Sequence, residues 1–305
     1  MAENRPVLVT GASGLIGRAL CESLRNDRVA IQRLRRDKPS TFTEDNVFWE
    51  RGEGRHSITD TTYEAVVHLA AESIMGVWTA AKKKRIRDSR VEMTRRICEH
   101  FAKRKDKPRV ILCASAIGYY GDRRDESLVE SSPPGKGFLA ETCQEWEAAA
   151  EAARAAGIRM VHVRIGLVLS RDGGLLKAML TPFKLGLGSR LGSGNQWMSW
   201  IEIGDLIRAV RFLIDRNDLS GVFNCAAPNP VTNTEFTRTL ASVLQRPTFF
   251  PIPAFALKLI PGDIGSEALL AGARVQPKRL LESGFRFQHP DLREALESLL
   301  VRKTT

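Results

Sequence analysis

The chain has 305 residues, of which 43% are apolar and 27% charged, and its formal net charge is +11. This balance is typical of a globular chain that buries a sizeable core. It excludes disorder, collagen-like repeats and disulfide-dense miniproteins. No apolar run approaches the roughly 18 residues that a membrane span needs.

Short β-branched runs alternate with longer helical patterns through the first half of the chain. The runs at 7–10, 29–34, 65–69, 110–114 and 160–165 predict buried strands, and 18–25 and 141–156 predict helices. Such alternation predicts an α/β fold with a doubly wound parallel sheet of Rossmann type. After Gly166 the pattern becomes irregular and rich in glycine and proline, which indicates a smaller C-terminal lobe built on the sheet. We therefore expect a first lobe over 1–167 and a second, interwoven with it, over 168–305.

The positive charge is concentrated between Lys82 and Arg109, which hold thirteen Lys or Arg and four Asp or Glu. Ile86, Met93, Ile97 and Phe101 recur there at helical spacing, which predicts one helix with an apolar face and a basic face. A solvated helix surface is the favoured interpretation, and an anionic partner is the alternative. Nucleic acid is disfavoured because aromatic side chains are not interleaved with the basic ones.

The five cysteines are scattered without a C-x-x-C pair, and the five histidines show no metal-ligand spacing. The first residues, 1–6, are polar and do not resemble a signal peptide. We expect reduced thiols, no metal, no membrane contact and a cytoplasmic location. A homodimer is one possible assembly.

The sharpest chemical motif is T-G-A-S-G-L-I-G at 10–17, which follows the first predicted strand and opens the first helix. Glycine permits the tight turn, the close approach of a pyrophosphate and the packing of helix on strand. The phosphate then lies at a helix N-terminus, where free amides favour anions. The spacing is G-x-x-G-x-x-G. The predicted dinucleotide-binding residues of this motif are Gly11, Ser13, Gly14, Leu15, Ile16 and Gly17.

The second predicted strand distinguishes between the two nicotinamide cofactors. A carboxylate about 20 residues beyond the glycines would bind the ribose hydroxyls of NAD. The strand instead ends R-L-R-R, and Arg36 stands nineteen residues after Gly17. Because a guanidinium can bind a 2′-phosphate bidentately, Arg36 favours NADP, with NADPH preferred over NADH.

Several motifs together resemble a known family. TGASGLIG, HLAA at 68–71 and SAIGYYG at 115–121 are similar to extended short-chain dehydrogenases/reductases of the NAD-dependent epimerase/dehydratase type. The stretches 78–91, 138–147, 181–201 and 224–236 resemble an atypical epimerase-like subgroup, also labelled cell-division-inhibitor-like, which has its own C-terminal segment, here at about 246–300. The resemblance implies an NAD(P)-binding lobe and a small substrate lobe. It also implies cofactor contacts at Leu69, Ala70 and Ala71.

The same resemblance removes the usual catalytic pair. The family's tyrosine and lysine positions fall on Phe138 and Thr142, and its serine position falls on Ala116. Phenylalanine cannot transfer a proton, so the usual acid–base chemistry is missing. Ser115 and Tyr120, at the end of a predicted strand, are the candidates to replace it. The subgroup also usually has His where Glu202 stands, which weakens any transfer of substrate chemistry.

Four residues are candidates for substrate contact. Lys83 matches a subgroup lysine, Arg190 and Trp197 belong to a glycine-rich loop, and Asn224 matches a family position near the substrate. A structural interpretation is open for each of them.

Three function classes follow from the sequence. The first is an NADP(H)-dependent epimerase-like oxidoreductase acting on an unidentified polar small molecule, with nucleotide-linked compounds as one class. The second is a catalytically inactive NADP-binding sensor or regulatory protein. The third is an anionic-partner binder that uses the basic stretch 82–109.

Overall fold

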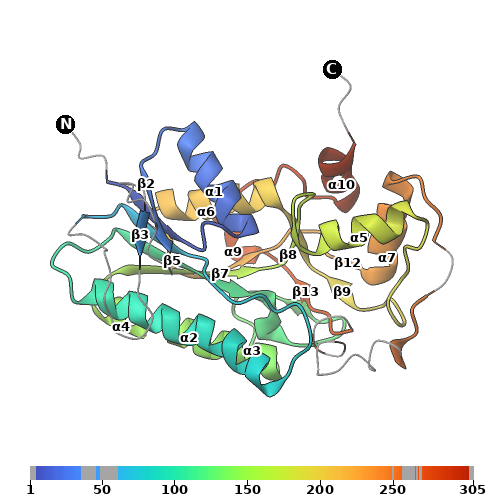
Figure 1. Cartoon of the computed structure of the whole chain (residues 1–305), viewed down its shortest axis with the longest axis horizontal. Helices are drawn as coiled ribbons and strands as arrows, with labels where there is room; N and C mark the ends of the chain where they lie inside the picture. The colour runs from blue at the N-terminus through green and yellow to red at the C-terminus, as the bar shows by residue number, and fades with distance from the viewer. Residues whose placement is uncertain are drawn as a thin grey trace.

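The structure is a computed structural model that describes residues 5–35, 46–48, 61–248, 251–255, 265, 267 and 270–301. A seven-stranded sheet forms its centre, with strand order β11-β7-β5-β4-β1-β2-β3 and every pairing parallel (Figure 1). The strands are β1 Val7–Thr10, β2 Ile31–Arg35, β3 Asn46–Phe48, β4 Ala65–His68, β5 Val110–Ala116, β7 Arg159–Ile165 and β11 Gly221–Cys225. The predicted doubly wound fold is confirmed, and β3 lies where no strand was predicted.

Helices cover both faces of this sheet, which explains why its central strands are apolar on both sides. Val7 and Val9 face one core with α1 (Leu15–Asn26) and α6 (Ile203–Asp215). Leu8, between them, faces the opposite core under α2 (Ala80–Ala102) and α4 (Glu151–Ala155). The strand order reverses between β1 and β4, and ligands of doubly wound sheets bind outside the carboxyl ends at such a point.

The predicted basic helix is shorter than expected, because α2 ends at Ala102 and the residues up to Arg109 are not helical. Its predicted apolar face is confirmed: Ile86, Ile97 and Phe101 are fully buried, and Met93 is half-buried beside them. Many of its basic side chains have partners within the chain, including pairs of Lys82 with Glu72, Lys84 with Asp88, Arg87 with Glu145 and Arg95 with Glu92.

The predicted helix 141–156 is two helices in the structure. α3 covers Phe138–Ala148, a turn follows at 149–150, and α4 begins at Glu151. Neither proline nor glycine occurs at the turn, so its sequence carries no break signal. Ala150 is fully buried in the core beneath α2, and packing at this point rather than helix propensity determines the break.

The second lobe has its own core but is not a separate unit. Leu169, Phe183, Trp200 and Phe236 are buried in that core. Its elements are β8 Leu167–Leu169, α5 Gly174–Lys184, β9 Trp197–Met198, β10 Trp200–Glu202, β12 Val231–Thr232, α7 Asn233–Val243 and α10 Leu292–Leu300. From this lobe the chain returns to the main sheet through α6 and β11, and α9 (Lys278–Glu282) packs on β11. The chain therefore crosses the boundary predicted at residue 167 more than once.

A buried carboxylate connects the C-terminal segment to α6. Asp205 accepts hydrogen bonds from the backbone amides of Gln288 and His289, and Glu202 caps α6 by accepting one from the amide of Asp205. In the described part of the chain, Glu202, Asp205 and His289 form a cluster of residue types that can bind a metal ion. One nitrogen or oxygen atom from each lies within 4.8 Å of the others. These hydrogen bonds already give both carboxylates a structural role.

Two histidines inside the sheet make stability sensitive to acid. Burial lowers the pKa of His68 and of His162 to about 4, and neither nitrogen of His162 has a hydrogen-bond partner among the described residues. An unfolded histidine titrates near 6.5, so the unfolded state binds more protons between pH 4 and 6.5. Stability is therefore lost as the pH falls through this window.

We expect His162→Leu to reduce this loss. Between pH 7 and pH 5, the free energy of unfolding should fall by about 2 kcal/mol less in the variant than in the wild type. Urea unfolding at both pH values measures the difference. An unchanged pH dependence would show that His162 is not neutral in the folded state.

Candidate functional site

The glycine turn after β1 has the shape that close ligand approach requires. Gly11 has φ of +69°, and a Cβ there would lie 2.8 Å from the backbone nitrogen of Ala70. A Cβ on Gly17 would lie 2.2 Å from the carbonyl oxygen of Gly11. The amide of Gly14 donates to that same oxygen at 2.9 Å. Backbone therefore fills the space that side chains would take, and other residues at 11 and 17 would disrupt the turn.

The N-terminus of α1 opens onto this turn without a side-chain cap. Gly14 is the N-cap residue, no side chain accepts a hydrogen bond there, and the first turn contains no acidic residue. Ser13 and Gly14 are exposed. The uncapped amides and the helix dipole suit an anionic phosphate. Leu15 and Ile16 follow as half-buried helix residues, and Leu15 packs against Gly173 of the second lobe.

The end of β4 lies directly beside the glycine turn. The hydroxyl oxygen of Thr10 accepts hydrogen bonds from the amides of Leu69 and Ala70, each at 3.1 Å, and lies 2.7 Å from Nδ1 of His68. Ala71 is exposed. The structure thus brings two of the predicted cofactor segments, 11–17 and 69–71, together at the carboxyl edge of the sheet. Arg36, predicted to bind a 2′-phosphate, lies outside the described residues.

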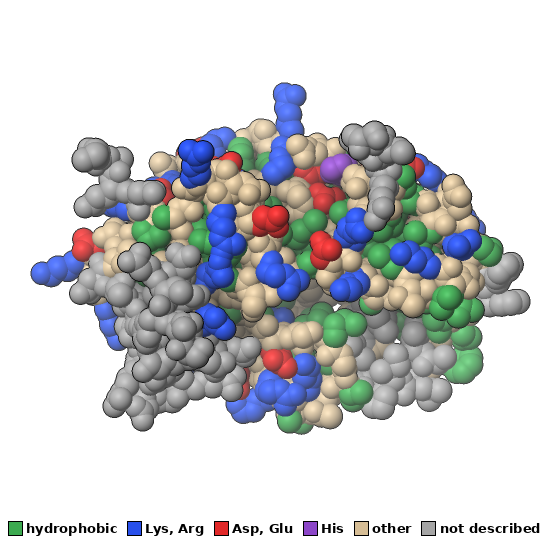
Figure 2. All heavy atoms as spheres, turned by 45° about the horizontal axis from the view of Figure 1, so that its top comes forward, with side chains coloured by type: hydrophobic (Ala, Val, Ile, Leu, Met, Phe, Trp, Pro, Cys, Tyr) green, Lys and Arg blue, Asp and Glu red, His purple; other side chains and the backbone are tan. Residues whose placement is uncertain are grey.

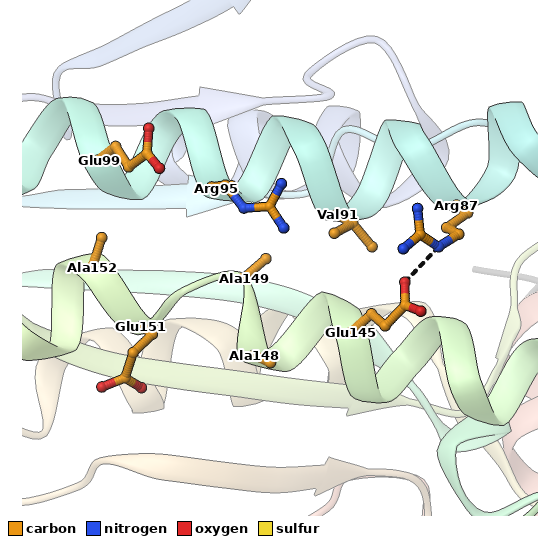
Figure 3. A pocket seen from close by; sticks show the side chains of 9 residues that line it. All are labelled: Arg87, Val91, Arg95, Glu99, Glu145, Ala148, Ala149, Glu151 and Ala152. Carbon is orange, nitrogen blue, oxygen red and sulfur yellow. Dashed lines mark ion pairs between the residues drawn. The ribbon is translucent and has the colours of Figure 1, made fainter.

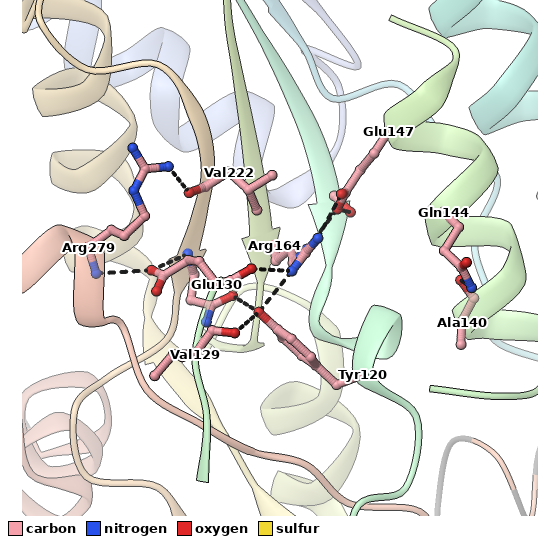
Figure 4. A network of polar contacts seen from close by, with 11 residues as sticks. Tyr120, Val129, Glu130, Ala140, Gln144, Glu147, Arg164, Val222 and Arg279 are labelled. Carbon is pink, nitrogen blue, oxygen red and sulfur yellow. Dashed lines mark hydrogen bonds and ion pairs between the residues drawn. The ribbon is translucent and has the colours of Figure 1, made fainter. Parts of the chain in front are cut away.

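Ser115 and Tyr120, expected as acid–base candidates, lie inside a buried polar network. Figure 4 shows Tyr120 in this network beside Arg164. Ser115 is 2% exposed and donates to Glu147 at 2.7 Å. Tyr120, in the 3-10 helix η1 (Ile117–Tyr120), is fully buried, lies 2.7 Å from Oδ1 of Asn224 and accepts from Arg164. Burial raises the pKa of Tyr120. This geometry does not fit the expected catalytic roles, because neither hydroxyl is accessible to a substrate.

Arg164 is the centre of that network. Its guanidinium pairs with both carboxylate oxygens of Glu147 at 2.8 Å and lies 3.3 Å from the ring centroid of Tyr119. Burial alone would lower the pKa of Arg164, but the hydrogen bonds that it donates to Glu147 outweigh burial and raise the pKa. Sequence reasoning missed Glu147, because a glutamate in a predicted helix gives no signal that its partner is a buried arginine on a strand.

Asn224, expected as a substrate contact, is also part of this network. It is fully buried, and its side-chain nitrogen donates to the carbonyl of Gln276 at 3.0 Å. Its backbone amide donates to Glu130, which also accepts from the amide of Arg279. These bonds join β11 to the C-terminal segment, and substrate contact by Asn224 stays a prediction.

The family's tyrosine position is occupied by the Phe138 ring, half-buried at the start of α3. Trp78 packs against it edge to face, with ring centroids 5.4 Å apart. Nζ of Lys83, from the first turns of α2, lies 5.2 Å from the centroid of Phe138. Lys83 is thus the predicted substrate residue that the structure places beside the family's catalytic position.

Arg190 and Trp197 lie in the second lobe, and none of the described contacts joins them to Lys83. Arg190 is exposed and donates to the carbonyl of Ser193. Trp197 donates from Nε1 to Asp125 at 2.8 Å, and the guanidinium of Arg274 lies 4.6 Å from the centroid of its ring. Its indole is therefore held by protein partners in this conformation.

A separate groove of about 350 Å³ lies between α2 and the pair α3 and α4 (Figure 3). It contains no predicted site residue and is lined by alanines, by the ion pair of Arg87 with Glu145, and by exposed charged side chains. Elsewhere Lys and Arg side chains are spread among acidic and apolar ones on the face seen in Figure 2. In the described part of the chain, no helix is long and apolar enough to cross a membrane.

The ion pair of Arg164 with Glu147 yields a stability prediction. The Arg164 side chain is 4% exposed, so Glu147→Ala would leave a buried charge without its partner. We expect a loss of about 3–5 kcal/mol in the free energy of unfolding, measured by urea denaturation. The double variant Glu147→Ala/Arg164→Met should recover part of that loss. A single variant within 1 kcal/mol of wild type would contradict the assignment.

Comparison with known proteins agrees with this arrangement. Residues 7–226 match the model of the NAD dependent epimerase/dehydratase family, and residues 252–299 match a domain of unknown function, DUF1731. Epimerase family protein Mb2239 of Mycobacterium bovis is 40% identical over 297 residues, covering 96% of this chain and 97% of that protein. A chloroplastic SDR39U1 homolog of Arabidopsis thaliana is 38% identical and covers 96% of this chain and 86% of its own.

Solved structures show the same relationship. Human epimerase family protein SDR39U1, crystallised with NADPH, superposes with a TM-score of 0.85 at 32% identity, covering 96% of this chain and 98% of that one. A nucleoside-diphosphate sugar epimerase from Corynebacterium glutamicum superposes at 0.78 with 31% identity, covering 98% of this chain and 59% of that one. From the fold, the glycine turn and these matches together, the chain belongs to the NAD dependent epimerase/dehydratase family, in the branch that carries a C-terminal DUF1731 domain.

Proposed function

We propose that this protein is an NADP(H)-dependent, epimerase-like oxidoreductase that acts on a polar small molecule. The observation that carries the proposal is the turn at 11–17, where backbone closes around an uncapped helix N-terminus beside the exposed end of β4. The human relative crystallised with NADPH supports the choice of cofactor.

The residues present fit a dinucleotide. The pyrophosphate would lie on the amides at 13–17, and the segment 69–71 would border it where Thr10 fixes the backbone. Arg36 would bind the 2′-phosphate that distinguishes NADP from NAD. When bound, such a cofactor supplies or accepts a hydride at the substrate carbon. The protein then orients the substrate, excludes water and moves a proton.

The substrate class follows from the side chains around that position. Lys83 offers a cation at the family's catalytic position, which suits a polar or anionic substrate. The relative described as a nucleoside-diphosphate sugar epimerase supports nucleotide-linked sugars as the first class to screen. Five buried, free cysteines are consistent with a reducing, cytoplasmic setting.

The second candidate is an NADP-binding regulatory protein without catalysis. Phe138 favours it, because a phenyl ring cannot replace the acid–base tyrosine. It differs from the first candidate in a single respect: cofactor would bind but no substrate would be reduced or epimerised. An anionic partner at α2 is less favoured, since Lys82, Lys84 and Arg87 already form ion pairs.

Cofactor titration tests the proposal. We expect NADPH to bind more tightly than NADH, measured by nicotinamide fluorescence on the purified protein. Arg36→Glu should weaken NADPH binding at least about tenfold and affect NADH much less, because it removes a phosphate partner and adds a like charge.

Lys84→Glu is the matched control, since it makes the same charge reversal at a side chain that is 76% exposed on α2. Its NADPH affinity should equal that of wild type. Equal loss in both variants would attribute the effect to net charge, and unchanged affinity in Arg36→Glu would refute the 2′-phosphate assignment.

A further inference from the structure

A cationic side chain lies where the family's proton-transferring tyrosine is missing. The ammonium of Lys83 is 5.2 Å from the centroid of the Phe138 ring, and Trp78 packs against the same ring. A cation held near an aromatic face is attracted by the ring's quadrupole. Phe138 therefore helps to position the ammonium that lies beside it.

This group lies at the carboxyl edge of the sheet. Trp78 and Lys83 follow β4, and Phe138 begins the helix that packs on the turn after β5. In that turn, a Cβ on Gly118 would lie 3.4 Å from Leu139, the residue after Phe138. The edge is the one that carries the glycine turn, where a doubly wound sheet binds its ligand.

The backbone that presents Lys83 is fixed from several directions. Thr79 caps α2 by accepting a hydrogen bond from the amide of Lys82, and Nε1 of Trp78 donates to the carbonyl of Ile74. Nζ of Lys82 pairs with Glu72 at 2.8 Å, so this neighbouring lysine serves the loop after β4. Ser89 and Arg90, further along α2, bond to the backbone of Glu72. The loop and the first turns of α2 thus form one braced unit.

The two hydroxyls expected to transfer protons, and two neighbouring groups on α3, are sequestered. The hydroxyls of Ser115 and Tyr120 belong to the buried network, and Thr142, at the family's lysine position, is 3% exposed. Burial raises the pKa of Cys143, one turn into the same helix, to about 12. Lys83 is half-buried and reaches the edge from a different helix.

We propose that Lys83 is the proton donor of this site, acting at the substrate oxygen in place of the missing tyrosine. The inference rests on the proposed function. In a reduction, the carbonyl carbon gains hydride from the reduced nicotinamide and a new C–H bond forms. The π electrons move to the oxygen, which takes a proton from the Lys83 ammonium. The resulting neutral amine recovers its proton from water, and in the oxidation direction the amine accepts the proton.

Chemical labelling tests the position of Lys83 without requiring a substrate. Native protein is acetylated with an amine-reactive ester, with and without NADP⁺, and each lysine is quantified by mass spectrometry. We expect NADP⁺ to slow labelling of Lys83 several-fold. Lys84, with a 76% exposed side chain, is the internal control and should label equally in both samples.

The outcomes separate this inference from the proposed function. If NADPH fluorescence shows no binding, the proposed function fails. If the cofactor binds and Lys83 labels at the same rate with and without it, Lys83 is remote from the nicotinamide and the inference is overturned.

A second experiment tests the chemistry with an o-quinone, 9,10-phenanthrenequinone, as the carbonyl probe and NADPH as reductant. Lys83→Met should lower kcat by about 100-fold, the lower end for general acid catalysis, with NADPH affinity unchanged. Lys83→Arg keeps the charge but cannot give up its proton, so KM should stay near wild type while kcat falls. Lys84→Met is the matched control and should behave as wild type.

Wild-type kcat in Lys83→Met would overturn the proposal. A raised KM with wild-type kcat in both Lys83 variants would assign the side chain to substrate binding. That result would also overturn proton donation. If the wild-type protein does not reduce the quinone, the labelling experiment is the test of the inference. Equal labelling of Lys83 with and without NADP⁺ then overturns it.

Discussion

The buried pair of Arg164 with Glu147 is the interaction on which the carboxyl edge of the main sheet depends. It joins β7 of the main sheet to α3, and through Tyr120 and Asn224 it reaches β11 and the C-terminal segment. Charges removed from water persist only when paired and hydrogen-bonded. One polar network therefore connects β7, α3, η1, β11 and the C-terminal segment, while apolar cores lie on both faces of the sheet.

The residues of the network and the residues proposed to contact a substrate are different sets. The hydroxyls of Ser115 and Tyr120 form hydrogen bonds within the network, which holds α3 and the turn after β5 in place. Phe138, Trp78 and Lys83 lie together at the edge outside the contacts of this network, and Glu72 supports them from the α2 side. Phe138 on α3 stands where the family has its tyrosine. In our proposal the polar group therefore comes from Lys83 on α2. In the proposed function, the backbone of the glycine turn provides the cofactor-binding surface, and no such exchange is needed there.

Much of the fold could be predicted because its signals are local. The buried runs of β1, β4, β5 and β7 and the glycine turn are each written within ten residues, and the turn needs glycine for steric reasons that hold in any context. The break between α3 and α4 and the end of α2 at Ala102 could not be predicted. At the break between α3 and α4, packing between segments far apart in sequence overrides helix propensity.

The sequence by itself determined the doubly wound sheet, the glycine turn and the absence of the family's tyrosine at Phe138. Only the tertiary structure decided what the remaining polar residues do. Asn224, Tyr120 and Ser115 are equally compatible in sequence with a ligand site and with a buried network, since a polar letter does not state its exposure. Lys83 is one of many lysines in its stretch. Its place beside Phe138 arises because two helices meet at the same edge of the sheet and bring together two residues that are more than fifty positions apart in the chain.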